Sequence, residues 1–166
     1  AASDVYKRQM VHHIGVESSE GLEKLRGSKY LQSNTENTYT EAQNELKKGR
    51  LVLYSGTACQ IEALKNVLGR EYENLFTIDL VCHGAPDEAV FKAYSRFELK
   101  GNLKKARSVS FRDENEYDKN EYIIKYFDKN GNIIKQVPQR QSHYLTAFLD
   151  GVCQSCLLYT SDAADA

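Results

Sequence analysis

Cys59 and Cys82 are the two residues of this chain whose chemistry stands out first. Cysteine thiolates are soft metal ligands and strong nucleophiles, so a pair of them can hold iron or zinc or carry out covalent chemistry. A free cysteine can equally be a small buried hydrophobic residue with no reactive role. The decision between these interpretations depends on whether the fold brings the two thiols to one place.

The segments around the cysteines predict a strand, a helix and a second strand. Leu51–Tyr54 and Leu75–Val81 are apolar and rich in strand-forming residues, whereas apolar residues recur at helical spacing in Ala58–Leu68. Thr57 and Gln60 have the spacing of a capping box, which sets the first turn of the helix. Such a βαβ unit makes the two strands parallel neighbours, joined by a right-handed crossover.

This arrangement places both cysteines at the same edge of the sheet, because parallel strands end on the same side. Cys59 falls at the second position of the helix, where free N–H groups and the helix dipole favour a thiolate. Cys82 follows the next strand, at the edge where open α/β sheets bind ligands. We therefore expect the two sulfurs to face one cleft, close together and without a disulfide bond.

The N-terminal part of the chain carries two further features. Gly27–Ser33 (GSKYLQS) is a run of small and hydrogen-bonding side chains that can follow a phosphate or a polar ring edge, although a plain polar strand would look the same. Val11–Val16 predicts a short strand, and His12 and His13 are expected to be surface residues rather than a metal pair. Thr38–Glu41 (TYTE) predicts a second capping box at the start of another helix.

The segments after the βαβ unit predict a helix followed by antiparallel strands. Pro86 and Asp87 begin a third helix, and three strands follow at 106–112, 121–127 and 133–137. The expected buried stripe of that helix is Val90, Ala93, Tyr94 and Phe97. Helical spacing resumes at His143–Leu149. The predicted fold class is α/β, a parallel βαβ core with an attached antiparallel three-stranded section.

Composition excludes several classes of protein. The 166 residues suit one domain, and 41% hydrophobic with 27% charged residues suits a globular chain. A net charge of -1 gives no general electrostatic case for nucleic acid, and no apolar run is long enough for a membrane span. Four cysteines without a regular framework predict reduced thiols and a cytoplasmic location. Neither a dinucleotide-binding glycine fingerprint nor a phosphate loop occurs.

The two ends of the chain have an unusual relationship. One oligonucleotide, read in its two orientations, can encode both Ser3–Gln9 (SDVYKRQ) and Cys156–Ser161 (CLLYTS). We therefore expect residues 1–9 and 156–166 to be non-native, adapter-derived tails with few core contacts, and residues 10–155 to be a fragment of one natural domain. The C-x-x-C pair of Cys153 and Cys156 is discounted for the same reason.

Four short segments, in order, carry a resemblance to a known family. They are GSKYLQS at 27–33, SGTACQ at 55–60, DLVCHGAP at 79–86 and FRD at 111–113. Together they resemble the coenzyme F-420 hydrogenase/dehydrogenase beta-subunit family of flavin and iron–sulfur proteins. One departure is Ala58, where many relatives have proline.

The resemblance implies FAD at the α/β core and an adjacent 4Fe-4S cluster. It implies that Cys59 and Cys82 are two cluster ligands, with a further C-x-x-C pair completing four. The catalytic residues stay unassigned. The residues that the resemblance assigns to cofactor binding are Ser28, Lys29, Tyr30, Gln32, Ser33, Gly56, Thr57, Gln60 and His83.

The implied function is that of a flavin-dependent oxidoreductase subunit, which transfers electrons between a 4Fe-4S cluster, FAD and a small redox substrate such as a deazaflavin coenzyme. The implied partner is a ferredoxin-like module or another electron-transfer subunit. The fragment itself is expected to be inactive because the completing cysteine pair, unless Cys153 belongs to it, is expected to lie beyond the fragment. Two alternatives stay open: a thiol-dependent enzyme with Cys59 as nucleophile and His83 as base, and a non-catalytic scaffold in which both cysteines are core.

Overall fold

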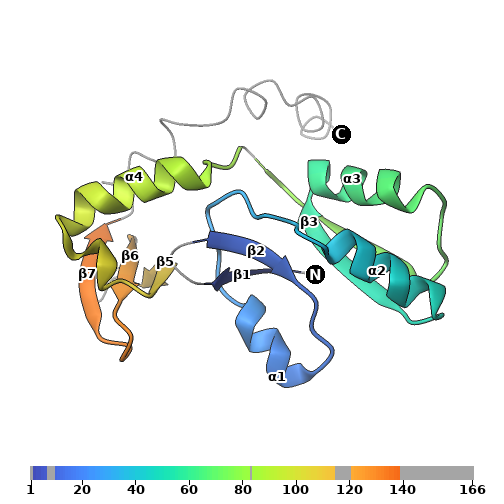
Figure 1. The fold of residues 1–166 in the computed structure, drawn as a ribbon, viewed down its shortest axis with the longest axis horizontal. Helices are drawn as coiled ribbons and strands as arrows, with labels where there is room; N and C mark the ends of the chain where they lie inside the picture. Colours follow the sequence, from blue (N-terminus) through green and yellow to red (C-terminus); the bar gives the residue numbers. More distant parts are fainter. Residues whose placement is uncertain (1, 7–9, 83, 115–120, 139–166) are drawn as a thin grey trace.

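The computed structural model describes residues 2–6, 10–82, 84–114 and 121–138, and it shows an α/β chain with three small sheets (Figure 1). The fold class is as predicted, and the predicted features at His83, His143–Leu149, Cys153 and 156–166 lie outside the described residues. The elements in chain order are β1 (Ala2–Tyr6), β2 (Met10–Ile14), α1 (Ser19–Leu22), the 3-10 helix η1 (Glu23–Leu25), α2 (Thr38–Lys47), β3 (Val52–Thr57), α3 (Ala58–Leu68), β4 (Leu75–Leu80), α4 (Glu88–Leu99), the 3-10 helix η2 (Asn102–Lys104), β5 (Ser108–Glu114), β6 (Tyr122–Phe127) and β7 (Ile133–Pro138).

The β3-α3-β4 unit confirms the central prediction. β3 and β4 pair in parallel, from Val52 opposite Leu75 to Thr57 opposite Leu80. The capping box of Thr57 and Gln60 begins α3, and Gly69 ends it in the left-handed conformation at φ 66°. α3 and α2 bury one face of this sheet in the first of two core clusters, made of Ala42, Leu46, Tyr54, Ile61, Leu64 and Leu68.

Among the described helices, none covers the other face of the same sheet. Partner residues in a parallel pair point to one side, so Leu53 and Phe76 share this outer face with Ile78 and Leu80. Their side chains are 58%, 56%, 49% and 53% exposed, respectively. Parallel sheets normally have both faces covered, so this apolar outer face is an unusual feature of the chain.

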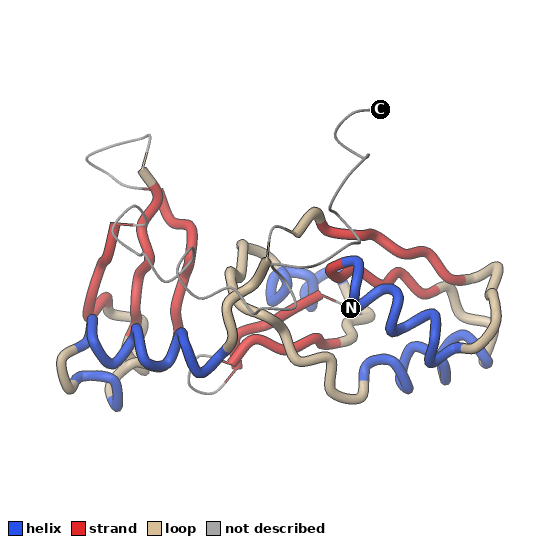
Figure 2. Tube along the Cα trace, turned by 90° about the horizontal axis from the view of Figure 1, so that it is seen from above, coloured by secondary structure: helices blue, strands red, loops and turns tan. Residues whose placement is uncertain are grey.

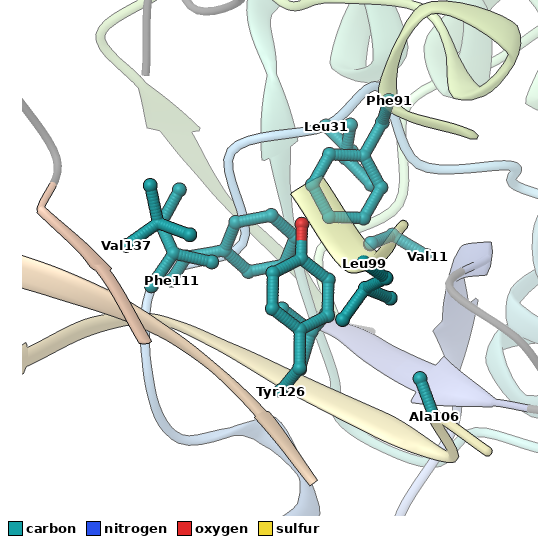
Figure 3. Close-up of a cluster of buried hydrophobic side chains, with 10 residues drawn as sticks. Val11, Leu31, Phe91, Leu99, Ala106, Phe111, Tyr126 and Val137 are labelled. Carbon is teal, nitrogen blue, oxygen red and sulfur yellow. The ribbon is translucent and has the colours of Figure 1, made fainter. Parts of the chain in front are cut away.

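The three-stranded sheet β5-β6-β7 is antiparallel, as predicted, and α4 lies along it (Figure 2). Together they form the second core cluster, in which Phe91, Phe111 and Tyr126 pack their rings together (Figure 3). The other members of this cluster are Val11, Leu31, Leu99, Ala106, Val109, Ile124 and Val137.

The predicted buried stripe of α4 is largely wrong. The helix buries Phe91, Ser95 and Leu99. Of the predicted residues, Tyr94 is partly buried against the second core cluster, whereas Phe97 is 74% exposed. Ser95 explains the error, because its hydroxyl forms a buried hydrogen bond with the Tyr126 hydroxyl at 3.1 Å. A serine that satisfies its hydroxyl inside the core belongs to the buried face, although its type suggests the surface.

The predicted capping role of Thr38 is also wrong. Asn37 is the N-cap of α2, and Thr38 occupies the first helical position. Its hydroxyl donates to the Thr35 carbonyl at 2.6 Å and lies 2.7 Å from the Tyr54 hydroxyl. The Thr38 side chain therefore hydrogen-bonds the buried Tyr54 hydroxyl instead of capping the helix.

Residues 2–6 make more contact than expected of a tail. They form β1, which pairs antiparallel with β2 from Ala2 opposite Ile14 to Tyr6 opposite Met10. Backbone pairing at an open strand edge needs no particular side chains, so even an unselected segment can form it. Among the described helices, none is long and apolar enough to cross a membrane.

Candidate functional site

Cys59 and Cys82 lie at the same edge of the β3–β4 sheet. Thr57 of β3 pairs in register with Leu80 of β4. Cys59 comes two residues after Thr57, and Cys82 comes two residues after Leu80. Cys59 is the second residue of α3 and is exposed, while Cys82 is partly buried, and both are free thiols. Their position at one sheet edge and the absence of a disulfide bond between them are confirmed, whereas a shared cleft, close approach of the two sulfurs and joint binding of a metal cluster stay predictions.

Each sulfur has a polar neighbour close by. The Cys59 sulfur lies 3.1 Å from the Thr57 hydroxyl oxygen, and the Gly84 N–H donates to the Cys82 sulfur at 3.4 Å. Hydrogen bonds to a sulfur stabilise negative charge on it and tune the potential of a bound cluster. The described residues contain no group of three or more histidine, cysteine or acidic side chains that could hold a metal by themselves.

Gln60 joins the polar segment Gly27–Ser33 to the helix that carries Cys59. Its side-chain nitrogen donates to the Ser33 carbonyl at 3.0 Å and to the Ser33 hydroxyl at 3.1 Å. Its side-chain oxygen accepts from the Thr57 N–H at 3.1 Å, completing the cap. One amide therefore holds the segment against the start of α3.

The remaining two segments of the resemblance meet Gly27–Ser33 as well. The Gln32 N–H donates to the Pro86 carbonyl at 3.1 Å, which ties the segment to the chain that follows Cys82. The Tyr30 ring packs edge-on against Phe111, with centroids 6.4 Å apart. The segments around residues 30, 57, 86 and 111 are thus gathered at one junction between the two core clusters.

Lys29 and Gly56, two predicted cofactor-binding residues, have roles in contacts within this chain. The Lys29 ammonium donates to the carbonyls of Leu25 at 3.0 Å and Arg26 at 2.7 Å, at the end of η1. At Gly56, an added Cβ would lie 3.1 Å from the Gln60 side-chain oxygen and 3.5 Å from the His13 ring. The missing side chain of Gly56 therefore makes room for Gln60 and His13. Ser28 and Gln32 are exposed and keep their side chains available.

The expected surface position of His13 is wrong, because the ring is buried beside the SGTACQ segment. His13 is 4% exposed, its Nε2 lies 3.3 Å from the Ser55 carbonyl oxygen, and its ring stacks on Tyr54 with centroids 5.6 Å apart. Burial lowers the pKa of His13, opposed by the hydrogen bond to Ser55. The alternation of side chains along the strand indicates the burial of His13, because Val11 lies on the same face and is also buried.

A cavity of about 710 Å³ lies elsewhere, between α1, α2 and β3. It is lined by Leu22, Ala42, Leu53 and Tyr54, among other residues, and by none of the predicted site residues. The cavity and the junction that gathers the four segments are thus separate features.

Comparison with known proteins identifies the family. The profile for the C terminus of the coenzyme F420 hydrogenase/dehydrogenase beta subunit matches residues 49–166. This range contains SGTACQ, DLVCHGAP and FRD, and it begins after GSKYLQS. It also includes residues 156–166, whose origin stays a prediction.

A solved structure has a similar fold. A chain in the xenon-derivatised F420-reducing [NiFe] hydrogenase complex from Methanosarcina barkeri is 16% identical, with a TM-score of 0.51. The alignment covers 93% of this chain and 53% of that one, so this chain spans about half of its length. The comparison with curated proteins finds no match. On the family match, the chain belongs to the coenzyme F420 hydrogenase/dehydrogenase beta-subunit family.

Proposed function

We propose that this chain is part of a flavin-dependent oxidoreductase subunit that transfers electrons between a 4Fe-4S cluster, FAD and a small redox substrate such as a deazaflavin coenzyme. The observation that carries the proposal is the gathering of Gly27–Ser33, Thr57–Gln60 and Pro86 by hydrogen bonds beside two free cysteines. Membership of a hydrogenase/dehydrogenase subunit family supports the redox class.

The donor chemistry of the two cysteines suits an iron–sulfur cluster. A 4Fe-4S cluster takes four thiolates, and Cys59 and Cys82, which follow neighbouring strands at one sheet edge, would supply two of them. The hydroxyl beside Cys59 and the N–H beside Cys82 would stabilise the charge on the ligated sulfurs. The other two ligands would come from residues outside the described ranges.

The polar junction suits a flavin. Bound FAD would supply two-electron chemistry and a cluster would supply one-electron chemistry. Ser28 and Gln32 have exposed side chains that can hydrogen-bond a polar ring edge, and Gln60 holds their segment in place through Ser33. Tyr30, Thr57 and His83 would also contact the flavin. Lys29 and Gly56 would act indirectly, because Lys29 bonds the Leu25 carbonyl and Gly56 leaves room for Gln60. A ferredoxin-like module or another electron-transfer subunit would be the partner, in the reducing cytoplasm.

The test is the cofactor content of the full-length protein, purified without oxygen. We expect flavin absorbance in the wild type, together with iron and acid-labile sulfide. Cys59→Ala and Cys82→Ala should each lose most of the iron while the folded yield is unchanged. Asn66→Ala, an exposed change on the same helix as Cys59, should keep both cofactors.

Three outcomes separate the alternatives. Full iron and flavin in both cysteine variants would refute the ligand assignment. A wild type without either cofactor that loses activity on alkylation of Cys59 would indicate a thiol-dependent enzyme. A wild type with no cofactor and no alkylation-sensitive activity would indicate a scaffold domain.

A further inference from the structure

The strand β5 contains a bulge at the FRD segment. Ser110 pairs with Lys125 and Asp113 pairs with Ile123, so three steps along β5 match only two along β6. The extra residue falls at Phe111 and Arg112, within the FRD segment. Bulges often redirect a side chain beside a functional site.

The two residues at the bulge have opposite environments. Phe111 is 1% exposed and packs in the core, where it also contacts the Tyr30 ring. Arg112 is exposed, and its guanidinium carbon lies over the Tyr122 ring, 4.3 Å from the centroid. Its Nη2 donates to the Tyr122 hydroxyl at 3.1 Å. This stacking holds the planar guanidinium in a fixed orientation and leaves other N–H groups to bind a ligand.

Tyr30 connects Arg112 to the Gly27–Ser33 segment. The pKa of Arg112 is raised, chiefly by its hydrogen bond to Tyr122 and also by the nearby phenol of Tyr30. Tyr30 belongs to the proposed flavin-contacting segment, and its ring packs against Phe111, the residue before Arg112, with centroids 6.4 Å apart. This contact places Arg112 near that segment.

Among the described residues, no carboxylate pairs with Arg112. Asp113 is the nearest acidic residue in sequence, but its carboxylate accepts from the Ser110 hydroxyl at 2.9 Å and pairs with Lys125 at 3.6 Å. By contrast, Arg26 pairs with one glutamate and Arg50 pairs with two. An oriented arginine without a carboxylate partner suits a bidentate contact to an external anion.

We propose that Arg112, oriented by Tyr122, binds a phosphate or carboxylate group of the redox ligand at the Gly27–Ser33 segment. The proposal deepens the proposed function and rests on it for the identity of that ligand. The anion can belong to the pyrophosphate of FAD or to the substrate, and the experiment separates these two sources.

The experiment compares Arg112→Gln and Arg112→Lys with the wild type in the full-length protein. Arg70→Gln is the matched control, because Arg70 also stacks on a tyrosine, 4.5 Å from the Tyr72 centroid, beyond the opposite end of α3. The readouts are FAD occupancy and the KM and kcat for a phosphate-bearing deazaflavin and for a neutral quinone. A third readout is calorimetric titration with inorganic pyrophosphate.

Arg112→Gln should weaken the anion contact about tenfold or more, the usual loss for one charge-assisted pair. If the anion belongs to FAD, flavin occupancy falls. If it belongs to the substrate, KM for the deazaflavin rises while flavin occupancy and the quinone reaction are unchanged. Arg112→Lys should recover only part of the loss because it keeps the charge but not the planar fork. Arg70→Gln should match the wild type.

The proposal is overturned if Arg112→Gln leaves flavin occupancy, the deazaflavin KM and pyrophosphate affinity within twofold of the wild type. A wild type without flavin would refute the proposed function, and the pyrophosphate titration would then decide the role of Arg112 alone. Binding lost in Arg112→Gln and kept in Arg70→Gln would support the anion site even in that case.

Discussion

At the scale of single residues, Gln60 connects the junction of segments by satisfying groups on both sides of it. The same amide completes the cap of α3 and bonds both oxygens of Ser33. It can do so only because Gly56 leaves space beneath it. A residue with an apparently local capping role therefore also sets tertiary structure.

The first prediction tests the space that Gly56 leaves for the Gln60 side chain. Gly56→Ala should destabilise the protein by about 1–3 kcal/mol, because the new Cβ would crowd Gln60 at 3.1 Å. Gly15→Ala is the control, since its Cβ would meet its nearest neighbour at an ordinary 3.8 Å. Chemical denaturation gives both free energies of unfolding, and equal values for the two variants would contradict the crowding argument.

The second prediction concerns pH and His13. Burial lowers its pKa in the folded protein below the ordinary value of 6.5, so the unfolded chain binds the proton more readily. Stability should therefore be lost as pH falls below about 6.5, with a slope of at most about 1.4 kcal/mol per pH unit from one proton. His13→Phe should reduce that slope.

The control for His13 is its neighbour on the same strand. His12→Gln leaves His13 in place and should keep the slope, as measured by denaturation at several pH values. A slope unaffected by His13→Phe would assign the pH dependence to other groups.

At the scale of elements, the sequence was sufficient where the signals were local. The capping box, the two apolar runs and Gly69 predicted β3-α3-β4, and the edge position of Cys59 and Cys82 followed from parallel pairing. The chain could not reveal which face of α4 is buried, because the choice depends on a hydroxyl partner on β6. The burial of His13 likewise depends on a distant carbonyl, that of Ser55, and on packing against Tyr54.

The third prediction tests the corrected face of α4. Phe91→Ala should cost about 3–5 kcal/mol, because Phe91 is fully buried against Phe111 and Tyr126. Phe97→Ala makes the same truncation at a side chain that is 74% exposed and should change stability by less than about 0.5 kcal/mol. Similar losses from both variants would favour the stripe predicted from the sequence.

The fourth prediction concerns the apolar outer face of β3 and β4. Replacing Phe76 and Ile78 by threonine should reduce concentration-dependent self-association, because large exposed apolar patches promote contact between molecules. Threonine keeps strand propensity, so stability should change little. Sedimentation over a concentration series measures the effect, and Val67→Thr, at a 50% exposed position on α3, is the control. Unchanged association in the double variant would contradict this role of the face.

At the scale of the whole molecule, the described chain has two hydrophobic clusters instead of one. The first lies between α2, α3 and β3, and the second lies between α4 and the three-stranded sheet. The chain contributes Val11 and Leu31 to the second cluster, then builds the first, and then returns to complete the second. The gathered segments lie where these two parts meet, since Leu31 is core in one and Ser33 bonds to the helix of the other.

This division bears on the cooperativity of unfolding. Two clusters joined by few hydrogen bonds can melt separately, so without a ligand the calorimetric enthalpy should exceed the van't Hoff enthalpy. A ligand bound at the junction contacts groups from both parts and binds only when both are folded, so its binding free energy stabilises both at once. Saturating flavin should therefore raise the melting temperature and bring the ratio of the two enthalpies towards one. The junction would then make the binding of a ligand the event that couples two separately melting parts into one cooperative unit.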